Sequence, residues 1–294
     1  MSLSNLIQYD KATCIERLEK ADTADLWDGF LEGQATLFFD AEFQWIANGD
    51  WWAPSERILE IGSGNGAYLS RLAGQFHEKT FQGVEILPLS VKQANEHYAG
   101  DNLAFREGDV EIFDAQLIDT ADIILFRLTL QHLKDSSTAL KHAADYLLPN
   151  GYVLIIDACD MAKRTSHPIS ALDEALRLVA QTQNKNGKGN RKVTLELLQT
   201  LENGKSPLSE LYEVVFSNLD SSGNILFDTI RFEGAKGKRL YFNHSLLFLN
   251  LLHRTYQIPI DLNKSYDELK AYFDDENAWS TPGMHYLVLK RKAK

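Results

Sequence analysis

ILEIGSGNGA, residues 58–67, decides the fold of this 294-residue chain. Ile58–Ile61 is a short apolar run of the kind found in buried strands, and Ala67–Phe76 has the pattern of a helix. The three glycines between them allow the backbone to turn sharply and to approach a ligand closely. The N-terminus of the following helix offers unpaired N–H groups and the positive end of its dipole. The stretch therefore predicts a strand–loop–helix unit that binds a ligand.

The alternation of strand and helix continues beyond this stretch. Further strands are predicted at Phe81–Val84, Leu103–Phe105, Ala121–Phe126 and Tyr152–Ile156, with helices at Pro88–Tyr98 and Ser136–Leu148. Pro88 suits the first turn of a helix, and Pro149-Asn150-Gly151 is expected to stop one helix and start a strand. Such alternation indicates a parallel, doubly wound α/β sheet with right-handed crossovers.

The two ends of the chain have different patterns. Residues 12–49 are predicted to be helical, and residues 1–56 are expected to form a helical N-terminal cover for the domain at 57–294. After Asp157, helices are predicted at Leu172–Gln183, Val193–Leu201, Leu240–Tyr256 and Tyr266–Phe273, and strands at Tyr212–Phe216 and His285–Leu289. The helical insertion at about 220–282 is long enough to suggest a functional cap.

Composition narrows the function classes. The formal net charge of −11 disfavours a nucleic-acid partner, and the basic clusters Lys185–Lys192 and Lys290–Lys294 are interpreted as solvated segments. The sequence contains no apolar run of membrane-helix length and no secretory signal pattern, so we expect no membrane partner. Two cysteines, Cys14 and Cys159, favour a reducing cytoplasm and give no zinc motif, so no metal is expected.

The ligand of the glycine loop has two interpretations. Gly62, Gly64 and Ala67 satisfy the dinucleotide pattern G-x-G-x-x-A, with Glu85 at a plausible distance for a ribose. Glu60 at the mouth of the loop would repel a pyrophosphate, whereas it would suit a cationic ligand such as S-adenosylmethionine. The electrostatics favour S-adenosylmethionine, and an NAD-dependent oxidoreductase stays as the alternative.

Several motifs together resemble the class I S-adenosylmethionine-dependent methyltransferases of the small-molecule type. Glu60–Gly66 is similar to the E/D-x-G-x-G-x-G loop, and Val84-Glu85 to the acidic end of the second strand. Gly108-Asp109-Val110 resembles the acidic position after the third strand, and Leu147–Tyr152 the turn before the fifth. The resemblance covers residues 55–160 well. It implies a Rossmann-like, mostly parallel seven-stranded sheet whose last strand is antiparallel.

The resemblance also implies cofactor-binding roles. Gly62, Gly64 and Gly66, with Ser63, would pack around the methionyl part of the cofactor. Glu85 would bind the ribose hydroxyls and Asp109, beside Val110, the adenine amino group. N-terminal segments close over the cofactor in similar enzymes, so Tyr9 is a further candidate. The cofactor-binding set is Tyr9, Glu60, Gly62, Ser63, Gly64, Gly66, Glu85, Asp109, Val110 and Arg127.

Residues for the chemistry are expected where strands end, because ligands of α/β sheets bind at the carboxyl edge. Phe126–Leu133 resembles an R-x-x-L-Q-H-L segment of small-molecule methyltransferases. His132 and Asp157 are the catalytic candidates, since a histidine titrates near neutrality and a carboxylate can accept a proton. The substrate-binding candidates are Arg127, Gln131, Asp160, Tyr241 and His244. Arg127 could bind a substrate carboxylate, or it could simply neutralise Asp157.

The resulting hypothesis is an enzyme that transfers a methyl group from S-adenosylmethionine to a small polar metabolite. Transfer to nitrogen or oxygen, with an amino-acid-like acceptor, would release S-adenosylhomocysteine. A non-catalytic S-adenosylmethionine-binding partner subunit is a second alternative. The oligomeric state is left open, a homodimer included.

Overall fold

The computed structural model describes residues 3, 5–112, 120–186, 189–227 and 230–293. The chain divides into two compact units. Unit 1 consists of residues 1–40, 163–186 and 230–282, and unit 2 of residues 41–162, 187–229 and 283–294. The division between residues 56 and 57 stays a prediction, and those parts of both predicted domains that fall in the gaps lie outside the described residues.

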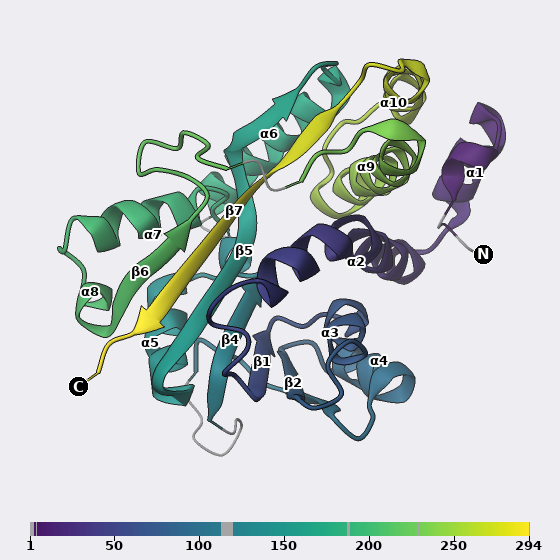
Figure 1. Cartoon of the computed structure of the whole chain (residues 1–294). Helices are drawn as coiled ribbons and strands as arrows, with labels where there is room; N and C mark the ends of the chain where they lie inside the picture. Colours follow the sequence, from purple (N-terminus) through teal and green to yellow (C-terminus); the bar gives the residue numbers. More distant parts are fainter. Residues whose placement is uncertain (1–2, 4, 113–119, 187–188, 228–229, 294) are drawn as a thin grey trace. The chain divides into compact units, whose positions relative to one another are not determined.

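The described chain contains one seven-stranded sheet in the order β3-β2-β1-β4-β5-β7-β6 (Figure 1). The strands are β1 (Arg57–Ile61), β2 (Thr80–Glu85), β3 (Leu103–Glu107), β4 (Ala121–Arg127), β5 (Leu147–Thr165), β6 (Tyr212–Ser217) and β7 (Ser280–Arg291). The pairs that join β1 to β2 and β4, β2 to β3, and β4 to β5 are parallel. The last strand, β7, is antiparallel to β6. The predicted doubly wound, mostly parallel sheet with an antiparallel last strand is confirmed.

Helices of unit 2 connect these strands. They are α3 (Ala67–Ala73), α4 (Pro88–Tyr98), α5 (Ser136–Tyr146), α7 (Val193–Glu202) and the short α8 (Leu208–Leu211), with a 3-10 turn η2 (Leu130–His132). Pro88 occupies the first turn of α4, where its missing N–H costs no hydrogen bond. Helix α3 ends at Ala73, three residues earlier than predicted, because Gly74 follows.

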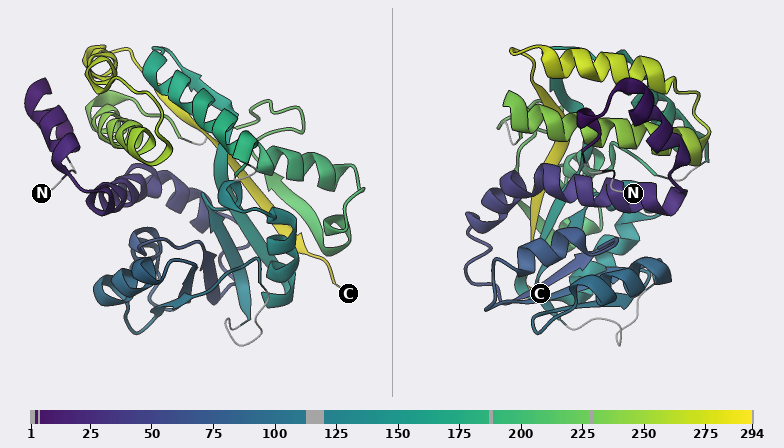
Figure 2. Two further views of the ribbon diagram at one scale, coloured as in Figure 1. Left: turned by 180° about the vertical axis from the view of Figure 1, so that it is seen from behind. Right: turned by 90° about the vertical axis from the view of Figure 1, so that its right-hand side faces the viewer.

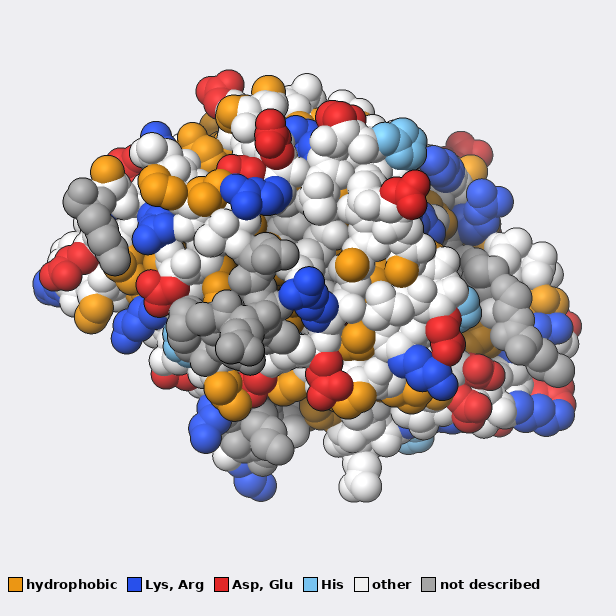
Figure 3. Space-filling model, turned by 90° about the horizontal axis from the view of Figure 1, so that it is seen from below, with side chains coloured by type: hydrophobic (Ala, Val, Ile, Leu, Met, Phe, Trp, Pro, Cys, Tyr) orange, Lys and Arg blue, Asp and Glu red, His pale blue; other side chains and the backbone are white. Residues whose placement is uncertain are grey.

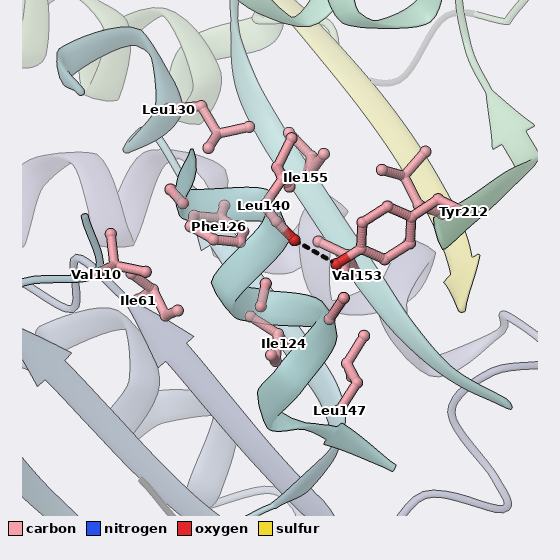
Figure 4. Close-up of a cluster of buried hydrophobic side chains, with 14 of the residues drawn as sticks. Ile61, Val110, Ile124, Phe126, Leu130, Leu140, Leu147, Val153, Ile155 and Tyr212 are labelled. Atoms are coloured by element: carbon pink, nitrogen blue, oxygen red, sulfur yellow. Dashed lines mark hydrogen bonds between the residues drawn. The ribbon is translucent and has the colours of Figure 1, made fainter. Parts of the chain in front are cut away.

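One apolar core fills the space between α5, α7 and one face of the sheet (Figure 4). Ile61, Ile124, Phe126, Val153 and Ile155 come from three neighbouring strands and are almost completely buried. The Tyr212 hydroxyl donates to the Leu140 carbonyl over 2.7 Å and thereby joins β6 to α5. Burial of these side chains fixes the sheet register that positions the ends of β1 and β4.

The turn before the fifth strand differs from the prediction. Helix α5 ends at Tyr146, and β5 already begins at Leu147. Ala121 pairs with Leu147 and Ile123 with Tyr152, so residues 148–151 form a bulge inside the strand rather than a separate turn. Asn150 has the left-handed backbone (φ 64°) that asparagine tolerates.

Unit 1 is helical. It contains η1 (Leu6–Gln8), α1 (Lys11–Lys20), the first part of α2 (Thr23–Ala47), α6 (Ser170–Asn186), α9 (Gly234–Tyr256) and α10 (Leu262–Asp274). Helices α9 and α10 lie side by side in both views of Figure 2. The predicted helical insertion before the last strand is confirmed. The predicted helical segment 12–49 consists of two helices, α1 and α2. Asp22 separates them, because its side chain accepts a hydrogen bond from the Asp25 N–H and caps the N-terminus of α2.

The face of the molecule in Figure 3 carries acidic and basic side chains interspersed with apolar ones. Within the described ranges, none of the helices is both long and apolar enough to cross a membrane.

Candidate functional site

The glycine loop between β1 and α3 has a backbone that only glycine adopts readily. Gly62, Gly64 and Gly66 have φ angles of 75°, 56° and 82°. A Cβ atom on Gly62 would lie 2.4 Å from the Thr129 hydroxyl oxygen, and one on Gly66 would lie 2.7 Å from the Phe105 ring. The loop is therefore held close to its neighbours at Gly62 and Gly66, where a side chain would not fit.

Glu85 ends β2 and orders the loop directly. Its Oε2 atom accepts a hydrogen bond from the Gly64 N–H over 3.0 Å, and its Oε1 atom accepts one from the Leu87 N–H over 3.0 Å. Each carboxylate oxygen retains a second lone pair for a ligand. Ile86 and Leu87 follow with more than half of their surface exposed, which is unusual for large apolar residues beside a polar loop.

Asp109 lies close to the same edge of the sheet, two residues beyond β3. Glu85 pairs with Glu107 in register, so the chain segments that follow β2 and β3 leave the sheet side by side. Asp109 Oδ1 accepts a hydrogen bond from the Glu111 N–H over 2.9 Å, the geometry of an Asx turn. Val110 is buried, and its carbonyl contacts His142 Nδ1 at 2.7 Å.

A buried charged cluster lies next to the glycine loop. Glu60 pairs in register with Leu125, and side chains alternate along a strand, so Arg127 lies on the same sheet face as Glu60. Arg127 Nε donates to Glu42 Oε2 over 2.7 Å, and the guanidinium lies 4.0 Å from the centroid of the Tyr68 ring. The side chains of Glu42 and Arg127 are 0% and 5% exposed. Two carboxyl groups thus surround one guanidinium in the interior.

The cluster is incompletely satisfied. Among the described residues, Glu42 Oε1, Glu60 Oε2 and the Ser63 hydroxyl are buried polar atoms without a hydrogen-bond partner. Burial raises the pKa of Glu60 to about 8, although the charge of Arg127 opposes the shift. Buried polar atoms normally have partners, so these three atoms, gathered around the glycine loop, make it the candidate binding site.

Arg127 is paired with Glu42, so the interpretation that it simply neutralises Asp157 is wrong. Its contact with a substrate carboxylate stays a prediction. Sequence reasoning missed Glu42 and Tyr68. A signal for Glu42 was present, because it stands between Phe38 and Trp45 at helical spacing, where a charged residue on an apolar face needs a partner.

Asp157 does not end its strand as predicted, because β5 continues to Thr165. The carboxylate is fully buried, and it accepts hydrogen bonds from the Gln131 N–H over 3.0 Å and the Ala158 N–H over 2.8 Å. Burial raises its pKa to about 6, while these two N–H groups oppose the shift. Asp157 therefore holds the η2 segment against β5.

Asp160, Gln131 and Arg191 form a second polar cluster close by. Arg191 makes a two-pronged ion pair with Asp160 (2.8 and 2.6 Å) and donates to Gln131 Oε1 over 3.2 Å. The Asn190 N–H also donates to the Gln131 carbonyl over 2.7 Å. The interpretation of Lys185–Lys192 as a solvated segment is wrong for Arg191, whose side chain is only 13% exposed; residues 187–188 lie outside the described chain.

His132 lies at the end of η2 and keeps an exposed surface. Crowding by the surrounding protein, and to a lesser extent the charge of Arg191, lower its pKa to about 4. The imidazole is therefore neutral at pH 7, but a pKa this low makes it a weaker base than the ordinary histidine expected from the sequence.

Three predicted site residues belong to unit 1. The Tyr9 ring lies 4.0 Å from the Arg17 guanidinium carbon, and its carbonyl accepts a hydrogen bond from the Tyr266 hydroxyl. Tyr241 is buried against Phe232, with ring centroids 5.2 Å apart. His244 stacks on Phe30, with ring centroids 4.8 Å apart. Their roles at the cofactor and substrate stay predictions.

Side chains of the types that ligate metals are scattered in the part of the chain that is described. There, no group of three or more His, Cys, Asp or Glu side chains is arranged to hold a metal ion. Cys14 and Cys159 are both buried as free thiols.

Comparison with known proteins identifies residues 53–212 as a match to the family model described as "Methyltransferase domain". The curated protein "Methyltransferase str2" of Strobilurus tenacellus is 30% identical over 104 residues. That match covers 35% of this chain and 35% of that protein, so the chain matches about a third of the length of this relative.

Two solved structures share the fold. One is a methyltransferase in complex with the Haloferax volcanii activator Trm112, with 16% identity, a TM-score of 0.52 and coverage of 92% of this chain and 97% of that one. The other is the plantazolicin methyltransferase BpumL in complex with a triazolic desmethylPZN analog and SAH, with 14% identity, a TM-score of 0.52 and coverage of 94% and 93%. The family model matches more than half of the chain, and the resemblance to class I S-adenosylmethionine-dependent methyltransferases is confirmed: this chain belongs to the methyltransferase-domain family.

Proposed function

We propose that this protein transfers a methyl group from S-adenosylmethionine to nitrogen or oxygen of a small polar acceptor and releases S-adenosylhomocysteine. The observation that carries the proposal is the buried Glu60 carboxyl, with an unpartnered oxygen, at the start of a loop of left-handed glycines. Such a site suits a ligand that brings positive charge close to the backbone, and it disfavours the pyrophosphate of NAD.

The residues around the loop fit the remaining parts of this donor. Glu85 has free lone pairs for ribose hydroxyls while it orders the Gly64 N–H. Asp109 stands at the neighbouring strand end, where it would accept from the adenine amino group. The exposed apolar side chains of Ile86 and Leu87 would cover a flat aromatic base.

The donor supplies an activated methyl group, so the protein needs mainly to align the acceptor and, where necessary, to remove a proton. His132, neutral at pH 7, is the proposed proton acceptor. Asp157, a catalytic candidate from sequence, holds the Gln131 N–H and would orient the η2 segment that carries His132.

An amino-acid-like acceptor is the finer proposal, with Arg127, Gln131, Asp160, Tyr241 and His244 as the proposed contacts. The Glu42–Arg127 and Asp160–Arg191 pairs weaken the carboxylate part of this idea, because both guanidinium groups already have carboxylate partners. A homodimer and a cytoplasmic location likewise stay predictions.

The first experiment is calorimetric titration with S-adenosylmethionine and with NAD, followed by a metabolite screen with methyl-labelled donor. We expect binding of the first ligand only, and label transfer to a polar acceptor. Binding of NAD alone would overturn the proposal, and donor binding without any turnover would favour the non-catalytic subunit.

A matched pair of variants locates the site. Gly64→Val should abolish donor binding, because a branched side chain fills the space that the ligand needs next to the backbone. Gly204→Val is the control, since Gly204 has a similar left-handed backbone (φ 64°) but no atom within 4 Å of an added Cβ. If both variants fold and both bind the donor normally, the glycine loop is not the site.

A further inference from the structure

The charged cluster of Glu42, Arg127 and Glu60 has more acid than base. Glu42 and Arg127 form a buried pair over 2.7 Å, which leaves Glu60 as the group without its own counter-charge. The other titratable groups that interact with Glu60 are Glu85 on β2 and Tyr68 on α3, and neither supplies positive charge. When Glu60 is ionised, the cluster of three therefore carries one net negative charge.

Two side-chain oxygens define the position at which a positive charge would offset the net negative charge of the cluster. Glu42 Oε1 and Glu60 Oε2 are both buried acceptors without a partner among the described residues, and Glu60 leads directly into the glycine loop. An uncompensated carboxylate in the interior is costly, whereas a positive charge bound beside it, a sulfonium included, offsets that cost by electrostatic attraction without a hydrogen bond. A cationic ligand would complete the cluster, and a ligand with one positive charge fewer would not.

We propose that Glu42, together with Glu60 and Arg127, makes this site selective for a ligand whose reacting sulfur is positively charged over the neutral thioether that remains after methyl transfer. The inference rests on the proposed function, because it assigns the cluster to the methyl donor. Glu42, on a helix preceding the glycine loop, is then a specificity-determining residue. Without Glu42, Arg127 would neutralise Glu60 and the preference for positive charge would be lost.

Substitutions change the net charge of Glu42, Arg127 and Glu60 in a known way. If Glu42 had only a structural role, ligand selectivity would not follow that net charge. The net charge of the cluster is −1 in the wild type, zero in Glu60→Gln and zero in Glu42→Gln. In the double variant Glu42→Gln with Arg127→Met the net charge returns to −1 once Glu60 is ionised, a form that loses the support of Arg127 but is favoured by a bound cation. Glu213→Gln, an exposed acid on the edge strand β6, is the control for general loss of negative charge.

The measurement is calorimetric affinity at pH 8.5 for S-adenosylmethionine, for S-adenosylhomocysteine and for a stable analogue with an amine in place of the methylsulfonium. We expect the wild type and Glu213→Gln to prefer the two cationic ligands on the order of tenfold. Glu60→Gln and Glu42→Gln should bind all three ligands within about twofold, and the double variant should regain the preference. Circular dichroism and retained binding of S-adenosylhomocysteine establish that each variant is folded.

Two outcomes would overturn the inference while leaving the methyltransferase assignment intact. One is equal affinity of the wild type for donor and product. The other is a double variant that shows no more preference than Glu42→Gln, since selectivity would then not follow net charge. Failure of the wild type to bind either sulfur ligand would instead overturn the proposed function itself.

Discussion

Two polar clusters of unit 2, one next to the glycine loop and one on β5 beside η2, differ in how well their atoms are satisfied. In the first, Glu42 and Glu60 surround Arg127 and leave buried oxygens without partners. In the second, both oxygens of Asp157 accept backbone N–H groups and both oxygens of Asp160 bind Arg191. The comparison favours the first cluster as the proposed ligand site, whereas the hydrogen bonds of the second hold η2 in place.

The largest expected effect breaks the first cluster. Arg127→Met should reduce the free energy of unfolding by about 3–5 kcal/mol, because it leaves the Glu42 carboxylate buried without a counter-charge. Urea denaturation monitored by circular dichroism measures the change. Adding Glu42→Gln should recover most of the loss, and a single-variant loss below about 1 kcal/mol would show that the pair contributes little.

The second-largest effect is expected on ligand affinity at Glu85, which orders the glycine loop. Glu85→Ala should weaken S-adenosylmethionine binding by about 1.5–3 kcal/mol, the range for a hydrogen bond to a charged group. Calorimetry decides, with Glu107→Ala as control because Glu107 is the exposed register partner of Glu85 on β3. Equal affinity of the folded Glu85→Ala variant and the wild type would remove Glu85 from the site.

A pH series sharpens the comparison further. With a pKa of about 8, Glu60 is protonated at pH 6–7 in the empty site, and a cationic donor favours the ionised form. Donor affinity should therefore rise with pH by up to about tenfold per unit, or about 1.4 kcal/mol, and level off above pH 8. In Glu60→Gln the slope attributable to this carboxyl should be absent; a slope identical to that of the wild type contradicts the assignment.

The smallest effect is expected in the second cluster. Arg191→Met should cost about 1 kcal/mol or less in stability, because the side chain of Asp160 is 37% exposed and solvent screens the pair. The same change should raise the pKa of His132, since the charge of Arg191 lowers it. Chemical denaturation and NMR titration of the imidazole test both points, with Lys192→Met as a neighbouring control. A loss as large as that of Arg127→Met would remove the distinction between the clusters.

The order of elements was predictable because it rests on local patterns. Strand–helix alternation and the glycine spacing at Gly62, Gly64 and Gly66 specify a parallel sheet with a tight turn between β1 and α3, and Pro88 marks the start of α4. The length of β5 was not predictable, because pairing with neighbouring strands decides how far a strand extends. The sequence predicts a turn at residues 148–151. The bulge found there was not predictable, because it also depends on how β5 pairs with β4.

The sequence by itself determined the fold class and the family, and it singled out Glu60, Glu85 and Asp109 as candidate site residues, since these follow from residue types at fixed local spacing. Only the tertiary structure decided the partners of the charged groups. Glu42 and Arg127 are 85 positions apart, and Asp160 and Arg191 are 31 apart. Which carboxylate reaches which guanidinium depends on how the helices and loops cover the faces of the sheet. Burial then determines how strongly each ion pair contributes to stability and how strongly it shifts the pKa of neighbouring groups.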